Sequence, residues 1–320
     1  MPNTKAAPLA KAAPLALGML GVICFSLTFP ATTAAERSFS PLIVGAGRSV
    51  IAAAVAAAIL AWRRESLLPP RQIIGPMLVI AATVGIGFGL LSAIALRQVD
   101  SVHVAVIAGL IPAATAGMAA WRGGERPSRG YWAALALGLA AVIAFAVIEG
   151  GGRLRTADLL ILVAIAVAGC GYAEGGMLAR DFDGWRVICW GVIVALPVSL
   201  PVTVVAVAQA PPRHVGAAAV LGLGWVGVVS MCLGFFAWYQ GMARGGVATI
   251  GKLQLAQPAL TLGWSALLLG EHVGVLSGAA AAVVIAAAAI GRNAKVGRPA
   301  KAQHARADSS QVNDQVSAVM

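Results

Sequence analysis

Residues 258–271 read PALTLGWSALLLGE, and residues 112–125 read PAATAGMAAWRGGE. At a fixed offset of 146 residues the two segments agree at seven of fourteen positions, including the proline, the threonine, both glycines and the final glutamate. Each segment is an apolar run that begins at a proline and ends in Gly-Glu. Shared alanines arise easily in so Ala-rich a chain, but these other residues do not. We therefore interpret the chain as two related halves.

The apolar runs on either side of these segments are long enough to cross a membrane. A membrane-spanning helix needs roughly 20 apolar residues to cross about 30 Å of hydrocarbon, and unpaired backbone groups are not tolerated in lipid. The sequence predicts an all-α membrane protein with ten spans, at about 15–34, 41–62, 74–95, 101–121, 131–148, 158–178, 187–208, 216–238, 246–268 and 273–291.

The repeated segment is the fourth span of each set of five. Because five is an odd number, the second set enters the membrane from the opposite side, which is the inverted-repeat arrangement of many secondary transporters. The sequence predicts two inverted five-helix repeats, 15–148 and 158–291, joined by an external linker at 149–157. Residues 1–14 are predicted to be a cytoplasmic lead, and residues 292–320 a disordered basic cytoplasmic tail.

Composition agrees with a protein embedded in lipid. Hydrophobic residues make up 59% of the chain and charged residues 11%, whereas soluble domains have about 25% charged residues. The net charge of +11 does not indicate nucleic acid, because the basic residues are dispersed and no nucleic-acid motif accompanies them. With the N-terminus inside, 16 Lys and Arg lie on the cytoplasmic side and 5 outside. This bias predicts a multi-pass protein of the inner (cytoplasmic) membrane with both termini in the cytoplasm.

The first span has a second interpretation. Lys5 and Lys11 precede a short apolar stretch, and PATTAAERS after it resembles a signal-peptide cleavage site. The internal repeat instead requires this span as its first helix.

Several motifs in order resemble the EamA-type members of the drug/metabolite transporter superfamily. They are SPLIVGAGR (Ser40–Arg48), AIALRQVDSVHVAVIAGLIP with the following GGE (Ala93–Glu125), GYAEGGMLAR (Gly171–Arg180) and FFAWYQGMARGGVATIGKLQLAQP with LLLGE (Phe235–Glu271). The resemblance covers residues 15–291. It implies ten helices, both termini inside, and export or exchange of a small metabolite or drug. Members of the family are commonly rich in aromatic residues, whereas this chain has only 8 Phe and 3 Tyr.

Three ionisable residues lie inside predicted spans, where a charge costs at least about 2.5–3.5 kcal/mol on insertion scales. They are Arg48, Glu174 and Lys252. Glu174 and Lys252 lie at matching depths near the cytoplasmic side, so a pair between them is one hypothesis, and a proton or an anionic substrate could break it. Arg48 and Lys252 are also long enough to snorkel to the membrane surface. Glu174 is too short to do so, which favours a cavity-facing, proton-coupled role.

Other polar and backbone-breaking residues mark the fourth and ninth spans. Gln254 and Gln257 share one helix face and either line the pathway or hydrogen-bond to neighbouring helices. Pro112 and Pro258 are hinge candidates, with ordinary kinks as the alternative. The repeat-end acids Glu125 and Glu271 have a capping or loop role as the main interpretation and a gate contact as the other.

The predicted function is secondary active transport by alternating access, as an exporter or exchanger of a small molecule. The proposed substrate pathway consists of Arg48, Glu174, Lys252, Gln254 and Gln257. No nucleotide motif appears, so coupling to protons or to an exchanged solute is expected. The partners are the lipid bilayer and the solute, with a homodimer through spans five and ten left open. No cofactor, metal site or nucleic acid is implied. The alternatives are a non-transporting sensor or assembly protein, and an intramembrane enzyme.

Overall fold

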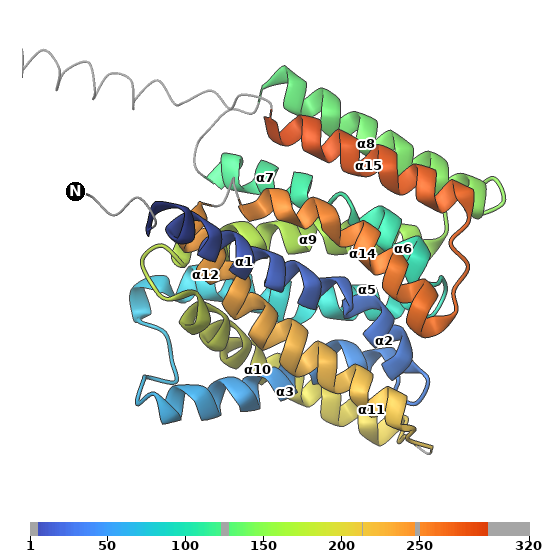
Figure 1. Ribbon diagram of the computed structural model, residues 1–320. Coiled ribbons are helices and arrows are strands. Elements are labelled where there is room, and N and C mark those ends of the chain that lie inside the picture. The colour runs from blue at the N-terminus through green and yellow to red at the C-terminus, as the bar shows by residue number, and fades with distance from the viewer. Residues whose placement is uncertain (1–5, 123–127, 213, 247–249, 294–320) are drawn as a thin grey trace, which may run out of the picture.

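The computed structural model describes residues 6–122, 128–212, 214–246 and 250–293, and within these ranges every regular element is a helix (Figure 1). The first half contains α1 (Ala6–Ser26), α2 (Thr28–Glu36), α3 (Pro41–Trp62), η1 (Arg71–Ile73), α4 (Ile74–Ile80), η2 (Ala81–Gly87), α5 (Phe88–Leu96), α6 (Ser101–Ala108), α7 (Ile111–Arg122) and α8 (Arg129–Glu149). The second half contains α9 (Thr156–Leu178), α10 (Gly184–Gln209), α11 (Ala217–Gly224), η3 (Trp225–Gly234), α12 (Phe235–Gly245), η4 (Gly251–Ala256), α14 (Gln257–Trp264), η5 (Ser265–Leu269) and α15 (Val275–Asn293).

Eight continuous helical stretches in the described residues are long and apolar enough to cross a membrane, and Val275–Ile290 forms a shorter apolar helix. The ninth expected span is divided instead into the 3-10 helix η4, the α-helix α14 and the π-helix η5. The all-helical membrane fold is therefore confirmed, and the segment that holds both glutamines is irregularly wound on both sides of α14.

Irregular windings recur at corresponding places in the two halves. The fourth span restarts as an α-helix at Ile111 and the ninth at Gln257, which are 146 residues apart, and a proline is the second residue of each new helix. The third and eighth spans each contain a π-helical segment, η2 and η3. Pro112 and Pro258 thus occupy helix starts, where the missing N–H costs no hydrogen bond. Their role as hinges stays a prediction.

The helix contacts form a two-fold pattern. Helix α3 packs on α10, and α8 packs on α15. Helix α1 packs on α12 as α9 packs on α5, and α7 packs on α9 as α14 packs on α1. Exchanging the halves therefore reproduces the pattern of neighbours. Figure 1 shows α8 and α15 as a separate layer beside the other helices. Because α1 lies inside this framework and contributes Phe25 to the core, the segment with the signal-peptide interpretation is part of the bundle.

Apolar side chains face outward where a soluble protein would carry polar ones. Only 33% of the α8 span and 28% of the α10 span are buried within the protein, and Leu, Ile and Val side chains on both helices are exposed. Such faces are compatible with hydrocarbon rather than water.

Gly45 allows α3 to approach α5 closely. A Cβ atom at this position would lie 2.7 Å from the Cα atom of Leu90, a backbone atom that cannot rotate away. We expect Gly45→Ala to destabilise the protein by about 1–3 kcal/mol, the usual cost of overpacking. Gly224→Ala is the control, because a Cβ there meets nothing within 4 Å. Thermal unfolding in detergent would measure both, and equal melting temperatures would contradict the close approach.

Candidate functional site

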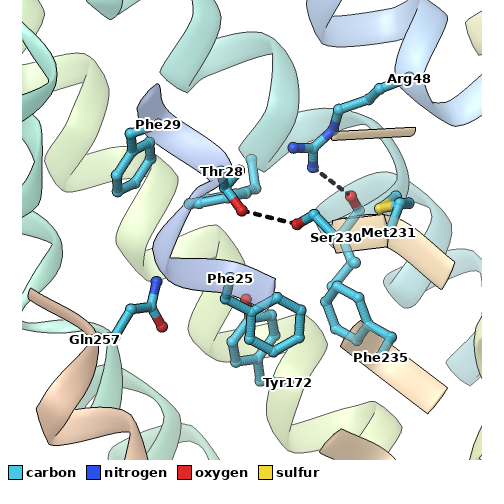
Figure 2. A pocket seen from close by; sticks show the side chains of 11 residues that line it. Phe25, Thr28, Phe29, Arg48, Tyr172, Ser230, Met231, Phe235 and Gln257 are labelled. Atoms are coloured by element: carbon cyan, nitrogen blue, oxygen red, sulfur yellow. Dashed lines mark hydrogen bonds between the residues drawn. The ribbon is translucent and has the colours of Figure 1, made fainter. Parts of the chain in front are cut away.

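A small cavity lies where the two halves meet (Figure 2). Its polar lining comes from five elements: Thr28 of α2, Arg48 of α3, Tyr172 of α9, Ser230 of η3 and Gln257 of α14. The space open to the centre of a water-sized sphere is about 10 Å³, which is room for about one water molecule. Of the three π-helical segments in the described residues, η2 and η3 reach it, through Val84 and Ser230. Single π turns in helices are frequent at functional sites.

Arg48 is the charged residue of this lining. Its side chain is buried in the protein at 4% exposure. One Nη donates to the carbonyl oxygen of Val84 at 3.5 Å, which is at the long limit for a hydrogen bond. The Nε atom is buried and has no partner in the described residues, and the guanidinium lies 5.6 Å from the centre of the Phe88 ring. In this structure Arg48 does not extend to the membrane surface, as the snorkelling alternative requires. Its side chain points into the cavity instead (Figure 2).

Aromatic rings form the walls. Four of the 8 phenylalanines and one of the 3 tyrosines line the cavity: Phe25, Phe29, Phe88, Phe235 and Tyr172. Phe25 lies 4.8 Å from Phe235 and 6.1 Å from Tyr172 between ring centroids. The low aromatic content of the sequence gave no sign of this, because the five rings come from distant segments and only the fold gathers them.

A hydroxyl pair and an amide complete the lining. Thr28 and Ser230 share a hydrogen bond of 2.8 Å between their side-chain oxygens, drawn dashed in Figure 2. Figure 2 shows Gln257 across the helical segment that carries Phe25, on the side away from Ser230. The Gln257 Oε1 has no hydrogen-bond partner in the described residues. Sequence reasoning missed Thr28 and Ser230. Their only signal was a small hydroxyl inside an apolar span, which usually marks a backbone contact.

Gln254 is buried near this site without lining it. Its exposure is 1%, and in the part of the chain described neither its Nε2 nor its Oε1 has a partner. Gln254 lies in the 3-10 helix η4, and Gln257 begins α14 three residues later. Both side chains are buried. Lys252, two positions before Gln254, falls on a different face and is exposed. Lys252 does not line the cavity.

Glu174 pairs with Arg122, not with Lys252. The Arg122 Nε donates to one carboxylate oxygen of Glu174 at 2.9 Å, and an Nη donates to the other at 2.8 Å. The Glu174 side chain is 6% exposed and that of Arg122 48%. The hypothesis of a Glu174–Lys252 pair is therefore wrong for this structure. Depth along a helix cannot tell which way a side chain faces. Arg122 follows the span expected at 101–121 and belongs to the last turn of α7.

Glu271 caps the first turn of α6. Its carboxylate accepts hydrogen bonds from the backbone N–H groups of Ser101 and Val102 and from the Ser101 hydroxyl. The Ser101 hydroxyl also lies 2.7 Å from that of Ser265. This agrees with the capping interpretation, since a carboxylate at a helix N-terminus satisfies orphan donors. Glu125 lies outside the described residues.

A buried His103–Asp158 pair was also missed by the sequence reasoning. The His103 Nε2 lies 2.6 Å from an Asp158 oxygen, and both side chains are almost fully buried. The other Asp158 oxygen accepts from the backbone N–H of Arg155. The pair ties the start of α9 to α6, and its only sequence signal was an acid in the first turn of an apolar span.

Comparisons with known proteins agree with this architecture. The EamA-like transporter family matches at residues 13–147 and again at 155–291. The chain is 40% identical over 279 residues to the uncharacterized transporter YdeK of Bacillus subtilis (strain 168), covering 87% of this chain and 96% of that protein. A solved crystal structure aligns with a TM-score of 0.62 over 88% of this chain and 96% of its own, at 20% identity, and so supports the fold alone. Two matches that together cover most of the chain, with a relative of this similarity, show that the protein belongs to the EamA-like transporter family of membrane proteins.

Proposed function

We propose that this membrane transporter carries a small solute across the cytoplasmic membrane by alternating access, as an exporter or exchanger. Ten spans in two inverted repeats would form the bundle, with the solute held between the halves. The observation that supports this most directly is the cavity lined from both halves, with the buried Arg48 in its wall. Binding at the interface of repeats is the pattern of secondary transporters.

In this proposal both termini are cytoplasmic, and each end of the cavity has its own closure. The Arg122–Glu174 pair closes the cytoplasmic side. The Ser101, Ser265 and Glu271 contacts close the external side. The cavity, with room for about one water, corresponds to the closed form between two open ones. Arg48 and Gln257 contact the solute, while Gln254 and Lys252 lie on the route toward the cytoplasm.

Coupling is assigned to Glu174. Its carboxylate holds two hydrogen bonds from Arg122 only while it is ionised, and a bound proton would weaken that pair. Proton binding would then favour opening on the cytoplasmic side. Transport measured in proteoliposomes against pH tests this assignment. Glu174→Gln should flatten the pH profile, and an unchanged profile would contradict proton coupling through this residue.

Transport itself is tested by comparing metabolites inside and outside cells with and without the gene. A solute that accumulates inside the cells lacking it, and leaves again when the gene is restored, is the expected result. Equal metabolite levels on both sides would favour the sensor or assembly alternative.

Alternating access predicts that fixing one closure stops transport. The Ser101 and Ser265 side-chain oxygens are 2.7 Å apart and buried, so cysteines at both positions in a background without the four native cysteines should cross-link on oxidation. We expect oxidation to reduce efflux at least about tenfold, with recovery on reduction. Each single-cysteine variant is the control. Full efflux through the cross-linked double variant would exclude opening at this end.

A further inference from the structure

The charges around the cavity do not balance. Arg48 is the ionisable cation of the lining, and no carboxylate belongs to that lining. The ion pairs found among the described residues join other groups: Glu174 with Arg122, Asp158 with His103, and Glu65 and Asp183 with Arg186. In that part of the chain, therefore, no acidic side chain lies within 4 Å of the Arg48 guanidinium. A buried ion without a counter-ion is costly.

The Arg48 guanidinium has a fixed position and unused hydrogen-bond donors. It has five N–H donors in a planar fork, and the hydrogen bonds found use one of them, on the Val84 carbonyl. Gly89 makes room for it, since a Cβ at that position would overlap the Arg48 Nε. The Phe88 ring supports one face. A guanidinium fixed in this way matches the two oxygens of a carboxylate.

The rest of the cavity suits an apolar body. Phe25, Tyr172 and Phe235 form a continuous aromatic wall, with Tyr172 and Phe235 5.4 Å apart edge to face. Figure 2 shows Arg48 and Gln257 at opposite ends of the group of lining side chains, with the rings of Phe25, Tyr172 and Phe235 along one side. Aromatic rings alone could also hold an organic cation. Arg48 opposes that choice, because it repels a cation in a site that offers no carboxylate to offset the repulsion.

The cavity favours a solute with one negative charge over a solute with two. The lining carries one positive charge, so a dianion such as a phosphate monoester would leave one negative charge buried without a partner. Lys252, the other basic residue of the predicted pathway, is exposed and lies outside the cavity lining.

We propose that the transported solute is a small organic monoanion, with its carboxylate on Arg48 and an apolar, preferably aromatic, body on the Phe25–Tyr172–Phe235 wall. That this solute is transported rests on the proposed function. That it binds in the cavity does not. Gln257 offers its amide to a polar group at the far end of the solute.

Three molecules with one skeleton and different charge test the proposal: 3-phenylpropanoate, 3-phenylpropanamide and 3-phenylpropylammonium. Their binding to the full chain in lipid nanodiscs is measured by calorimetry and by ligand-induced thermal shift. We expect 3-phenylpropanoate to bind at least about tenfold more tightly than the amide, since hydrogen bonds to charged groups are the stronger ones. Arg48→Gln should remove that preference, and Arg48→Lys should retain part of it. Arg63→Gln, at an exposed position away from the cavity, should leave the preference unchanged.

Several results would overturn the proposal. They are tightest binding of the ammonium compound, binding of none of the three, or a preference for the carboxylate that survives Arg48→Gln. Phenyl phosphate, which is mainly a dianion at neutral pH, should bind more weakly than 3-phenylpropanoate, and the reverse order would contradict the single charge. Unfolding temperatures of the unliganded variants show whether each retains its fold.

Flux measurements separate this inference from the proposed function. Radiolabelled 3-phenylpropanoate and 3-phenylpropylammonium are offered to proteoliposomes. Flux of the ammonium compound alone would support transport and reject the solute class. Binding of 3-phenylpropanoate that depends on Arg48 but is not followed by flux would support the class and reject transport.

Discussion

Arg122→Gln is expected to lower the stability of the protein more than Glu174→Gln does. Removing Arg122 leaves a carboxylate that is 6% exposed without its two charged donors. Removing the charge of Glu174 leaves a guanidinium that is nearly half exposed and can find water. For a fully buried pair the first loss would be about 3–5 kcal/mol. Because Arg122 is partly exposed, we expect about 1–2 kcal/mol.

The double variant completes the test. Arg122→Gln with Glu174→Gln should recover much of the stability lost in Arg122→Gln, because a neutral amide at 174 no longer requires a cation. Thermal unfolding of the four proteins in one detergent gives the coupling between the two positions. Additive effects would show that the pair contributes little. Arg186→Gln, which leaves the Glu65 carboxylate 29% exposed rather than 6%, is the matched control and should have the smaller effect.

Gln254→Met is expected to stabilise the protein and to impair transport. The amide of Gln254 is 1% exposed, and neither of its polar atoms has a partner in the described residues. Each buried unsatisfied group costs about 1–3 kcal/mol, so an apolar side chain of similar length should raise the melting temperature by several degrees. Under the proposed function, the retained amide of Gln254 would find its partner in another state of the transport cycle. We therefore expect efflux to fall roughly tenfold, the effect of about 1.4 kcal/mol.

Leu253→Met is the control for Gln254→Met. Leu253 is the preceding residue of η4 and is half buried, and a Leu-to-Met exchange keeps volume and polarity. It should change neither stability nor efflux by much. A fall in melting temperature with Gln254→Met would mean that the amide has a partner in the folded protein. Unchanged efflux with a raised melting temperature would remove Gln254 from the pathway.

Much of the fold follows from hydropathy and from one repeated segment. Apolar runs of about 20 residues located the helices, because lipid leaves few alternatives for the backbone. The match between 112–125 and 258–271 indicated two related halves, and the helix starts at Ile111 and Gln257 keep its offset. The irregular winding of the ninth span was not predicted, because a proline signals a break without specifying the 3-10 turns before it.

The candidate site was predicted only in part. Arg48 and Gln257 were identified because a polar residue inside an apolar span is costly and so needs a reason. The partner of Glu174 was missed because the rise along a helix gives depth but not direction. The aromatic wall was missed because Phe25, Tyr172 and Phe235 lie on three helices, and nothing local in the sequence relates them. Side-chain groupings of this kind depend on packing between helices rather than on pattern within one.

Helix α3 carries a buried cation, whereas α10, which packs on it from the other half, has no basic or acidic residue between Val187 and Gln209. The two halves thus share the pattern of helix contacts but not the placement of charge. Symmetry does not require the outward-open and inward-open forms to have equal free energies, and a difference of 1.4 kcal/mol corresponds to about a tenfold ratio of their populations. If the protein works by the proposed alternating access, we expect the two forms to be unequally populated before any gradient acts, with Arg48 contributing to the difference.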